Sequence, residues 1–294
     1  MSGNQPTSAG KVTVSVLGAR GMLGSDVVPC LRAAGYRVTE SDLPECDITR
    51  REHVEAAIDG SDVVINCAAY TDVDGAERDP ETAWAVNAAG PKILAGAAAE
   101  IDAYLVHIST DFVFDGTLAR PYAPDDRPHP INVYGRTKLA GESGVLSTWP
   151  RSSVIRVQWT YGHAGRHFVS KFLARALACD ELMMVDDQVG SPTWTRDVAC
   201  ALRALVVHQP AGIFHFAADG YATRFEVAEE ILAACGLEHK TLQPCRTSDF
   251  DAPADRPLNS RFDCSDIDRL LDSPRPHWRM SLGEFLAREQ GTVP

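Results

Sequence analysis

The sequence lacks the features that assign a chain to a membrane or to export. It has no apolar run near the roughly 20 residues that a membrane-spanning helix needs. Residues Met1–Gly10 are small and polar, without the basic and then apolar stretches that mark a secretory signal. These absences predict a cytoplasmic protein that has no membrane partner.

Positive charge is also scarce. The chain carries 28 basic and 40 acidic residues, a net charge of −12. Because nucleic-acid binders usually present a basic face, this balance argues against a nucleic acid as the partner. A small anionic ligand remains compatible with it, since helix N-termini and a few local cations can hold phosphate.

Paired cysteine motifs are absent too. The eight cysteines show no C-x-x-C spacing, so we expect reduced, mostly buried thiols and neither a disulfide framework nor a zinc site. We expect four histidines to be structural and not to bind a metal: His107, His163, His167 and His215.

What the chain does have is an alternation of strands and helices. Its 294 residues are 45% hydrophobic, enough for one or two domains. Strand-like runs at 11–17, 37–41, 62–69, 104–108 and 153–157 alternate with helical segments, which include a long one at about 80–100. A further helix is expected at 195–208. This order predicts an α/β fold with a doubly wound, Rossmann-like parallel sheet. We expect residues 11–160 to form mainly a dinucleotide-binding domain, and residues 161–294 a smaller, interleaved substrate-binding part.

A glycine-rich turn follows the first expected strand. Gly18, Gly21 and Gly24 have the spacing G-x-x-G-x-x-G. Glycine allows the backbone angles of a tight turn, and a bare loop lets a pyrophosphate approach the free N–H groups of the next helix. A turn without a ligand is the alternative, but the strand before it and the helix after it favour nucleotide binding.

Two charged residues at this turn favour different cofactors. Asp42 ends the second strand, where a carboxylate can accept hydrogen bonds from the adenosine ribose and favour NAD. Arg20, within the turn, could instead pair with a 2′-phosphate and favour NADP. The sequence leaves NADH and NADPH both open. Asp47 and Ile48 then either flank the adenine or mark an ordinary helix start capped by Asp47 or Thr49.

Tyr134 and Lys138 form the central chemical pair. Four positions apart in a helical segment, they share one face and lie one turn apart. A nearby ammonium favours the phenolate and lowers the pKa of a tyrosine, so we expect Lys138 to make Tyr134 a usable acid. Thr110 ends the fourth strand, where it either caps the strand end or adds a polar group beside the phenol.

Several motifs occur in one order: STDFVFDG at 109–116, NVYGRTKLAGE at 132–142, DDQVGSPT at 186–193 and RPLNSRFD at 256–263. With the glycine turn and the Trp159 strand end, they resemble the extended short-chain dehydrogenase/reductases, and within them the dTDP-4-dehydrorhamnose reductase family. The resemblance runs from about residue 11 to 288.

This resemblance implies NAD(P)H-dependent reduction of the 4-keto group of dTDP-4-dehydro-L-rhamnose by a monomer or homodimer. The implied catalytic residues are Thr110, Tyr134 and Lys138. The expected cofactor contacts are Gly18, Arg20, Gly21, Met22, Leu23, Gly24, Asp42, Asp47, Ile48, Ala69, Tyr70, Thr71, Tyr134 and Lys138. The expected substrate contacts are Val73, Thr110, Asp111, Phe112, Trp159, Gln188 and Arg256. Some members bind magnesium at a dimer interface, but no spacing here supports a metal site.

Individual substrate contacts have simpler alternatives. Trp159 either walls the sugar pocket or packs in the core. Gln188 either meets substrate or closes a turn with Asp187. Arg256 either binds the diphosphate, which suits a planar guanidinium, or makes a salt bridge.

Other functions remain in view. One is the reduction of a different dTDP-4-keto deoxysugar, and another is a non-catalytic, nucleotide-binding regulatory subunit. A dehydratase would need an Asp-Glu couple after Thr110, whereas Asp111 and Phe112 stand there.

Overall fold

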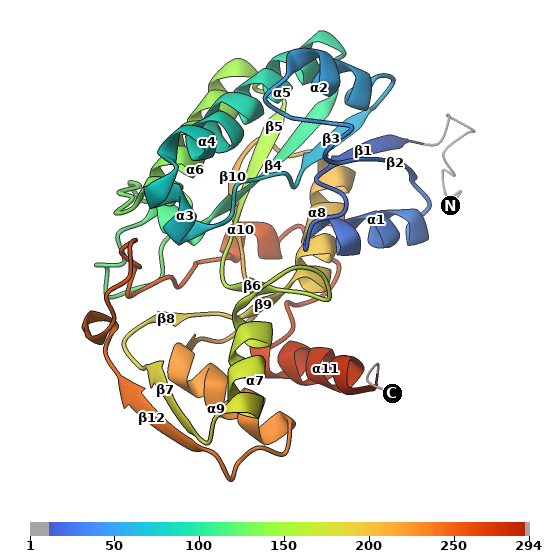
Figure 1. The fold of residues 1–294 in the computed structure, drawn as a ribbon. Coiled ribbons are helices and arrows are strands. Elements are labelled where there is room, and N and C mark those ends of the chain that lie inside the picture. Colours follow the sequence, from blue (N-terminus) through green and yellow to red (C-terminus); the bar gives the residue numbers. More distant parts are fainter. Residues whose placement is uncertain (1–11, 292–294) are drawn as a thin grey trace.

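A computed structural model describes residues 12–291 (Figure 1). Three expectations lie partly or wholly outside these residues: the polar segment Met1–Gly10, Lys11 at the start of the first strand, and residues 292–294. The described chain forms a larger part around a central sheet and a smaller part below it in the view of Figure 1.

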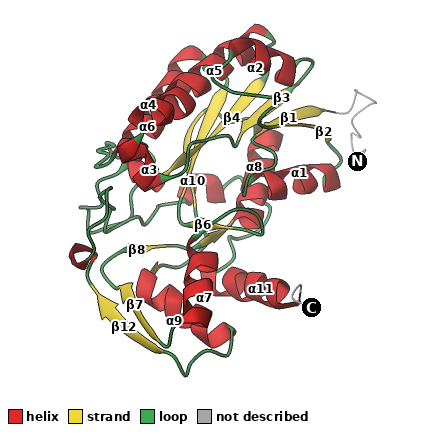
Figure 2. Ribbon diagram, viewed as in Figure 1, coloured by secondary structure: helices red, strands yellow, loops and turns green. Residues whose placement is uncertain are grey.

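A six-stranded sheet, parallel throughout, organises the larger part (Figure 2). Its spatial order is β10-β5-β4-β3-β1-β2. The strands are β1 Thr13–Leu17, β2 Arg37–Ser41, β3 Val63–Asn66, β4 Tyr104–Thr110, β5 Ser152–Val157 and β10 Gly212–Phe216. Chain order reverses between β1 and β3, which is where such sheets bind ligands beyond their carboxyl ends. The predicted doubly wound parallel sheet is confirmed.

Helices cover both faces of this sheet. On one face, α1 and α8 pack on residues such as Val16 and Val106. On the other, α2, α5 and α6 pack on Leu17 and Leu105. The helices of this part are α1 Gly24–Ala33, α2 Arg51–Ile58, α3 Val73–Arg78, α4 Pro80–Trp84, α5 Gly90–Glu100, α6 Val133–Thr148, α8 Thr195–His208 and α10 Ser265–Asp268. Every helix within residues 12–291 is too short or too polar to cross a lipid bilayer.

The smaller part has its own apolar core, which includes Phe172, Trp194, Ile231 and Trp278. Its elements are α7 Phe168–Ala178, α9 Arg224–Ala234, α11 Trp278–Gly291, and the strand pairs β6 Thr160–Tyr161 with β9 Thr193–Trp194, β7 Glu181–Val185 with β12 Thr241–Cys245, and β8 Val189–Gly190 with β11 Ala222–Thr223. Between these elements the chain returns to the larger part as α8 and β10. The division of roles near residue 160 stays a prediction.

Two local expectations differ from the structure. The third strand ends at Asn66 because its side chain turns back to accept a hydrogen bond from the Ala68 N–H at 3.1 Å. The helix expected across 80–100 contains a π-helical segment at Ala85–Ala89. Within it, the Asn87 amide accepts a hydrogen bond from the Tyr70 N–H and donates one to its carbonyl, both at 2.9 Å.

The expectation of mostly buried thiols is wrong. All eight cysteines are free, but only three are buried. Cys179 follows the last residue of α7 and Cys200 lies on the exposed side of α8, so neither position faces a core.

A buried ion pair joins α6 to the sheet. Arg156 on β5 and Glu142 on α6 form a bidentate pair, with N···O distances of 2.9 and 2.7 Å and side chains 1% and 2% exposed. Ser109, at the end of β4, donates a further hydrogen bond to Glu142 at 2.5 Å. Removing one partner would leave the other charge buried and unpaired, which is strongly destabilising. This contact therefore holds α6 against β4 and β5.

Glu142→Ala is expected to lower the free energy of unfolding by about 3–5 kcal/mol, because Arg156 would stay buried without its counter-ion. Urea denaturation measures the change. Glu55→Ala is the control, since Glu55 pairs with Arg51 on the exposed side of α2 and should shift the midpoint little. Equal shifts for the two variants would contradict this role of the buried pair.

Candidate active site

A cavity of about 640 Å³ opens at the carboxyl ends of the parallel strands. It runs from the glycine turn after β1, past the ends of β3 and β4, to Trp159 after β5. Most of the predicted site residues line it: Gly18, Arg20, Gly21, Met22, Leu23, Asp42, Asp47, Ile48, Ala69, Thr71, Val73, Thr110, Asp111, Phe112, Tyr134, Lys138 and Trp159.

The glycine turn is shaped by close backbone contacts. Gly18 has φ +72°, and a β-carbon there would lie 2.6 Å from the Ala68 nitrogen, so only glycine lets β1 and β3 end side by side. A β-carbon on Gly24 would lie 2.2 Å from the Gly18 carbonyl oxygen. Gly24 therefore permits close packing of turn and helix, and it does not line the cavity.

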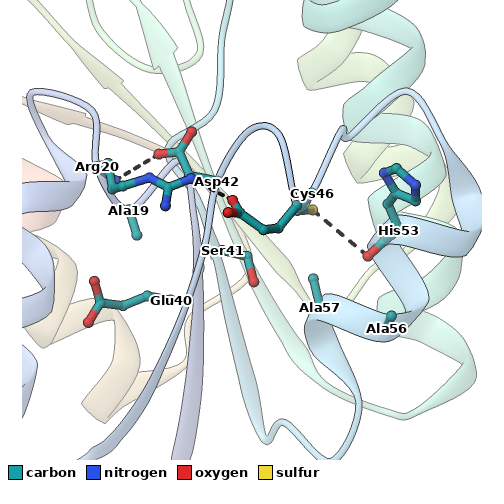
Figure 3. Close-up of a pocket in the computed structure, with 10 residues that line it drawn as sticks. Ala19, Arg20, Glu40, Ser41, Asp42, Cys46, His53, Ala56 and Ala57 are labelled. Atoms are coloured by element: carbon teal, nitrogen blue, oxygen red, sulfur yellow. Dashed lines mark hydrogen bonds and ion pairs between the residues drawn. The ribbon is translucent and has the colours of Figure 1, made fainter.

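The adenosine end of this predicted cofactor site is acidic. The Asp42 carboxylate accepts hydrogen bonds from the backbone N–H groups of Arg20 and Leu43, at 2.7 and 2.8 Å. The Arg20 side chain extends along the turn and pairs with Glu45 at 2.6 Å. Figure 3 shows Arg20 and Asp42 beside Glu40 at a neighbouring hollow of about 290 Å³. These carboxylates suit ribose hydroxyls better than a phosphate.

The helix-cap alternative for Asp47 and Thr49 is wrong. Helix α2 begins at Arg51, and Arg50 precedes it without a side-chain cap. Asp47 instead accepts hydrogen bonds from the Thr49 N–H and hydroxyl at 2.9 and 2.7 Å, which lower the pKa of its carboxyl. It shapes the turn that carries Ile48 to the cavity wall.

Tyr70 lies off the cavity wall. Its backbone forms hydrogen bonds with Asn87, and its side chain packs against the cluster of Ala76, Ala83 and Tyr134. Tyr70 thus supports the loop that presents Ala69 and Thr71 to the cavity.

Thr110, Tyr134 and Lys138 meet on the cavity wall. Asn132 caps α6 by accepting a hydrogen bond from the Gly135 N–H at 2.7 Å, which sets the start of the helix. The Tyr134 ring then packs edge-to-face on Phe112, with centroids 5.6 Å apart. The Thr110 hydroxyl accepts a hydrogen bond from the Phe112 N–H at 3.2 Å and donates one to the Asp111 carboxylate at 3.0 Å.

The electrostatics of this group differ from the sequence expectation. Burial raises the pKa of Tyr134 to about 12, although the hydrogen bond with the Thr110 hydroxyl lowers this pKa by a smaller amount. Burial lowers the pKa of Lys138 to about 8, although the negative charge of Glu142 raises this pKa by a smaller amount. The Lys138 ammonium donates to the Ile108 carbonyl at 2.6 Å. The prediction that Lys138 lowers the pKa of Tyr134 is therefore wrong here, because desolvation dominates and the ammonium is directed to a carbonyl.

Trp159 stands between this cavity and a second one of about 690 Å³, and it lines both. Its φ of 46° is left-handed, a conformation that bulky residues seldom adopt. Gly190 lies against the indole, since a β-carbon there would lie 2.7 Å from a ring atom. The indole thus forms a wall shared by the two cavities.

The structure brings Gln188 and Arg256 to the second cavity, away from Tyr134. Gln188 donates a hydrogen bond to the Thr247 hydroxyl at 3.1 Å, while Asp187 accepts bonds from the same threonine. Arg256 pairs with Asp74 at 2.8 Å. Arg256 thus makes the salt bridge that its structural alternative predicted, whereas Gln188 contacts a residue far away in sequence and does not close a local turn.

Sequence reasoning missed two residues here. Ser260 lies inside a quoted motif, and its hydroxyl donates to the buried Asp111 carboxylate at 2.5 Å. Arg224 begins α9 and lines the second cavity. Its guanidinium carbon lies 3.6 Å from the centre of the Trp159 ring. Neither position had a spacing that indicated a site.

Metal-ligand clusters are absent from residues 12–291, where no group of three or more His, Cys, Asp or Glu side chains could hold an ion. The histidines make local contacts instead. His107 lies beside Asn66, His215 beside Arg156, His167 caps α7, and His163 pairs with Glu289.

A family model described as the RmlD substrate binding domain matches residues 12–290. The chain belongs to the RmlD family. A dTDP-4-dehydrorhamnose reductase of Mycobacterium tuberculosis is 40% identical over 278 residues, 92% of this chain and 91% of that protein. A dTDP-4-keto-6-deoxy-D-glucose reductase of Streptomyces niveus is 37% identical over 273 residues, 91% of this chain and 94% of that one.

A solved structure extends the match. The dTDP-4-dehydrorhamnose reductase of Bacillus anthracis, in complex with NADP, superposes with a TM-score of 0.90 at 32% identity, covering 95% of this chain and 99% of that one. The family expected from the motifs is confirmed, and so is its Rossmann-like fold.

Lys138 is expected to lose its proton near pH 8, because burial disfavours its charged form. NMR of isotope-labelled lysine side chains across a pH series measures this. The transition near pH 8 should vanish in Lys138→Arg. If no lysine signal changes near pH 8, or if the change survives that substitution, the assignment is wrong.

Proposed function

We propose that this protein reduces the 4-keto group of dTDP-4-dehydro-L-rhamnose to give dTDP-L-rhamnose, with NADPH or NADH as the reductant. The observation that carries the proposal is one cavity whose wall holds both the glycine turn and the group Thr110, Tyr134 and Lys138. The reductase names of the relatives support the same substrate class. Cytoplasmic location, and a monomeric or dimeric state, stay predictions.

The residues present fit a dinucleotide. Gly18 and Gly21 leave the turn bare where α1 begins, so a pyrophosphate can approach its free N–H groups. Asp42 lies at the end of β2, beside the turn, where an adenosine ribose would lie. Lys138 faces the same cavity near Thr110, where it can hold the nicotinamide ribose. When bound, the cofactor supplies a hydride to the keto carbon.

Tyr134 delivers the proton. Burial raises the pKa of its phenol to about 12, so the phenol carries a proton at neutral pH and can donate it as negative charge grows on the sugar oxygen. Thr110 adds a hydrogen bond to that oxygen, a contact that strengthens in the transition state. Burial lowers the pKa of Lys138 to about 8, so its amine is still mostly charged at neutral pH, where it can hold the nicotinamide ribose.

A second candidate is the reduction of another dTDP-4-keto deoxysugar. The Streptomyces niveus relative carries such a name at nearly the same identity. The residues that support reduction lie on the cofactor and catalytic side, which these reactions share. A non-catalytic, nucleotide-binding role is less well supported, because Thr110, Tyr134 and Lys138 are all present and meet on one wall.

Tyr134→Phe is expected to lower kcat by about 10²–10⁴-fold, the usual value of a positioned general acid. Nucleotide binding should persist, because the ring remains. Nicotinamide absorbance measures turnover, and fluorescence titration measures cofactor affinity. Tyr36→Phe, remote from the cavity, is the control. Near-normal turnover in Tyr134→Phe would refute its role as the proton donor.

Cofactor preference offers a separate test, because Glu45 holds the Arg20 side chain. Glu45→Gln should free Arg20 for a 2′-phosphate and raise kcat/KM for NADPH relative to NADH by about two- to fivefold, the range of an exposed ion pair. Glu52→Gln, which breaks the Arg50 pair elsewhere on the surface, is the charge-matched control. An unchanged ratio, or an equal change in both variants, would refute the competition.

A further inference from the structure

The Arg224 guanidinium lies half-buried in the wall of the second cavity. It stacks on two aromatic rings, with its central carbon 3.6 Å from the centre of Trp159 and 4.6 Å from that of Phe168. Stacking of this kind orients the plane of a guanidinium and leaves its N–H donors at the edges available.

This guanidinium has no direct counter-ion within residues 12–291. None of these residues forms a hydrogen bond or ion pair with it, although the Asp111 carboxylate acts on it over a longer range. Burial lowers the pKa of Arg224 to about 9. Arg256, in the same cavity, differs because Asp74 holds it at 2.8 Å. A desolvated cation without a partner is costly in a folded protein unless an anion joins it.

The position of the cavity suggests which anion that is. Phe112 and Trp159 line both cavities, so the second one adjoins the catalytic wall. A sugar held at Tyr134 would have its attached group pass Trp159 and enter beside Arg224. There the wall offers the hydroxyls of Thr247, Ser248 and Ser260. Its volume of about 690 Å³ is within the usual range of small-molecule sites.

We infer that Arg224 is the main cation for the diphosphate of a nucleoside diphosphate sugar, in place of the Arg256 that the sequence favoured. The inference rests on the proposed function for the identity of the substrate. Two edges of a planar guanidinium match phosphate oxygens, and the Trp159 and Phe168 rings hold it in place. Arg256 instead ties the 254–256 loop to Asp74.

Isothermal calorimetry of the full chain with dTDP, and separately with inorganic pyrophosphate, tests this assignment. Arg224→Gln should weaken both probes by about ten- to hundredfold, the range expected for charge-assisted bonds. Arg224→Lys should retain part of the affinity. Arg256→Gln, the matched control from the same cavity, should change it less than about threefold. Binding of NADP should be unchanged in all three variants.

Wild-type affinity for dTDP in Arg224→Gln, or a larger loss in Arg256→Gln, would overturn the inference. So would an equal loss of NADP binding, which would indicate a general structural role. The wild type could bind pyrophosphate but not dTDP, while both variants behave as expected toward pyrophosphate. That result would support Arg224 as the anion site and count against the proposed nucleotide-sugar substrate. The Tyr134→Phe kinetics test the reduction itself, so the two failures are distinguishable.

Discussion

The site depends on how closely α6 approaches the backbone of its neighbours. A β-carbon on Gly135 would lie 2.1 Å from the Phe112 carbonyl oxygen, and one on Gly141 would lie 2.1 Å from the Asn87 carbonyl oxygen. At both positions any larger residue would push the helix away. The two glycines therefore let α6 lie directly on these carbonyls, and the Arg156–Glu142 pair holds it there. Tyr134 lies beside Gly135, and Lys138 lies between the two glycines. The close packing of α6 therefore also places both side chains in the cavity wall.

This close packing also sets the chemistry. Excluding water from α6 raises the pKa of Tyr134 to about 12 and lowers that of Lys138 to about 8. For a reductase this combination is useful, because a phenol that keeps its proton is ready to donate it. Near pH 8 the amine can change its charge while the phenol does not. Burial, more than the spacing of the pair, therefore determines which group holds a proton.

Much of the larger part was predictable because its signals are local. The β2 segment at 37–41 and the helix at 195–208 match their expected limits, since apolar periodicity and turn residues mark them. The glycine turn could also be predicted, because its glycine spacing after a strand is typical of a tight strand-to-helix turn. The stacking of Arg224 on Trp159 could not be predicted, since it arises only when α9 meets the loop after β5. The partner of Arg256 could not be predicted either, because Asp74 is far away in sequence.

Trp159 shows how the two parts of the chain come to share one site. Its left-handed backbone is a strain that surrounding contacts must sustain. The Ser191 N–H donates to the neighbouring Gln158 amide at 2.8 Å, and Gly190 leaves room for the indole. The β8 segment, from the second half of the chain, thereby stabilises a turn that follows β5 of the first. The Trp159 indole lines the catalytic cavity, and it also lines the second cavity, where Arg224 stacks on its ring. A change that relaxed Trp159 would alter both cavities together, because its side chain lines both of them.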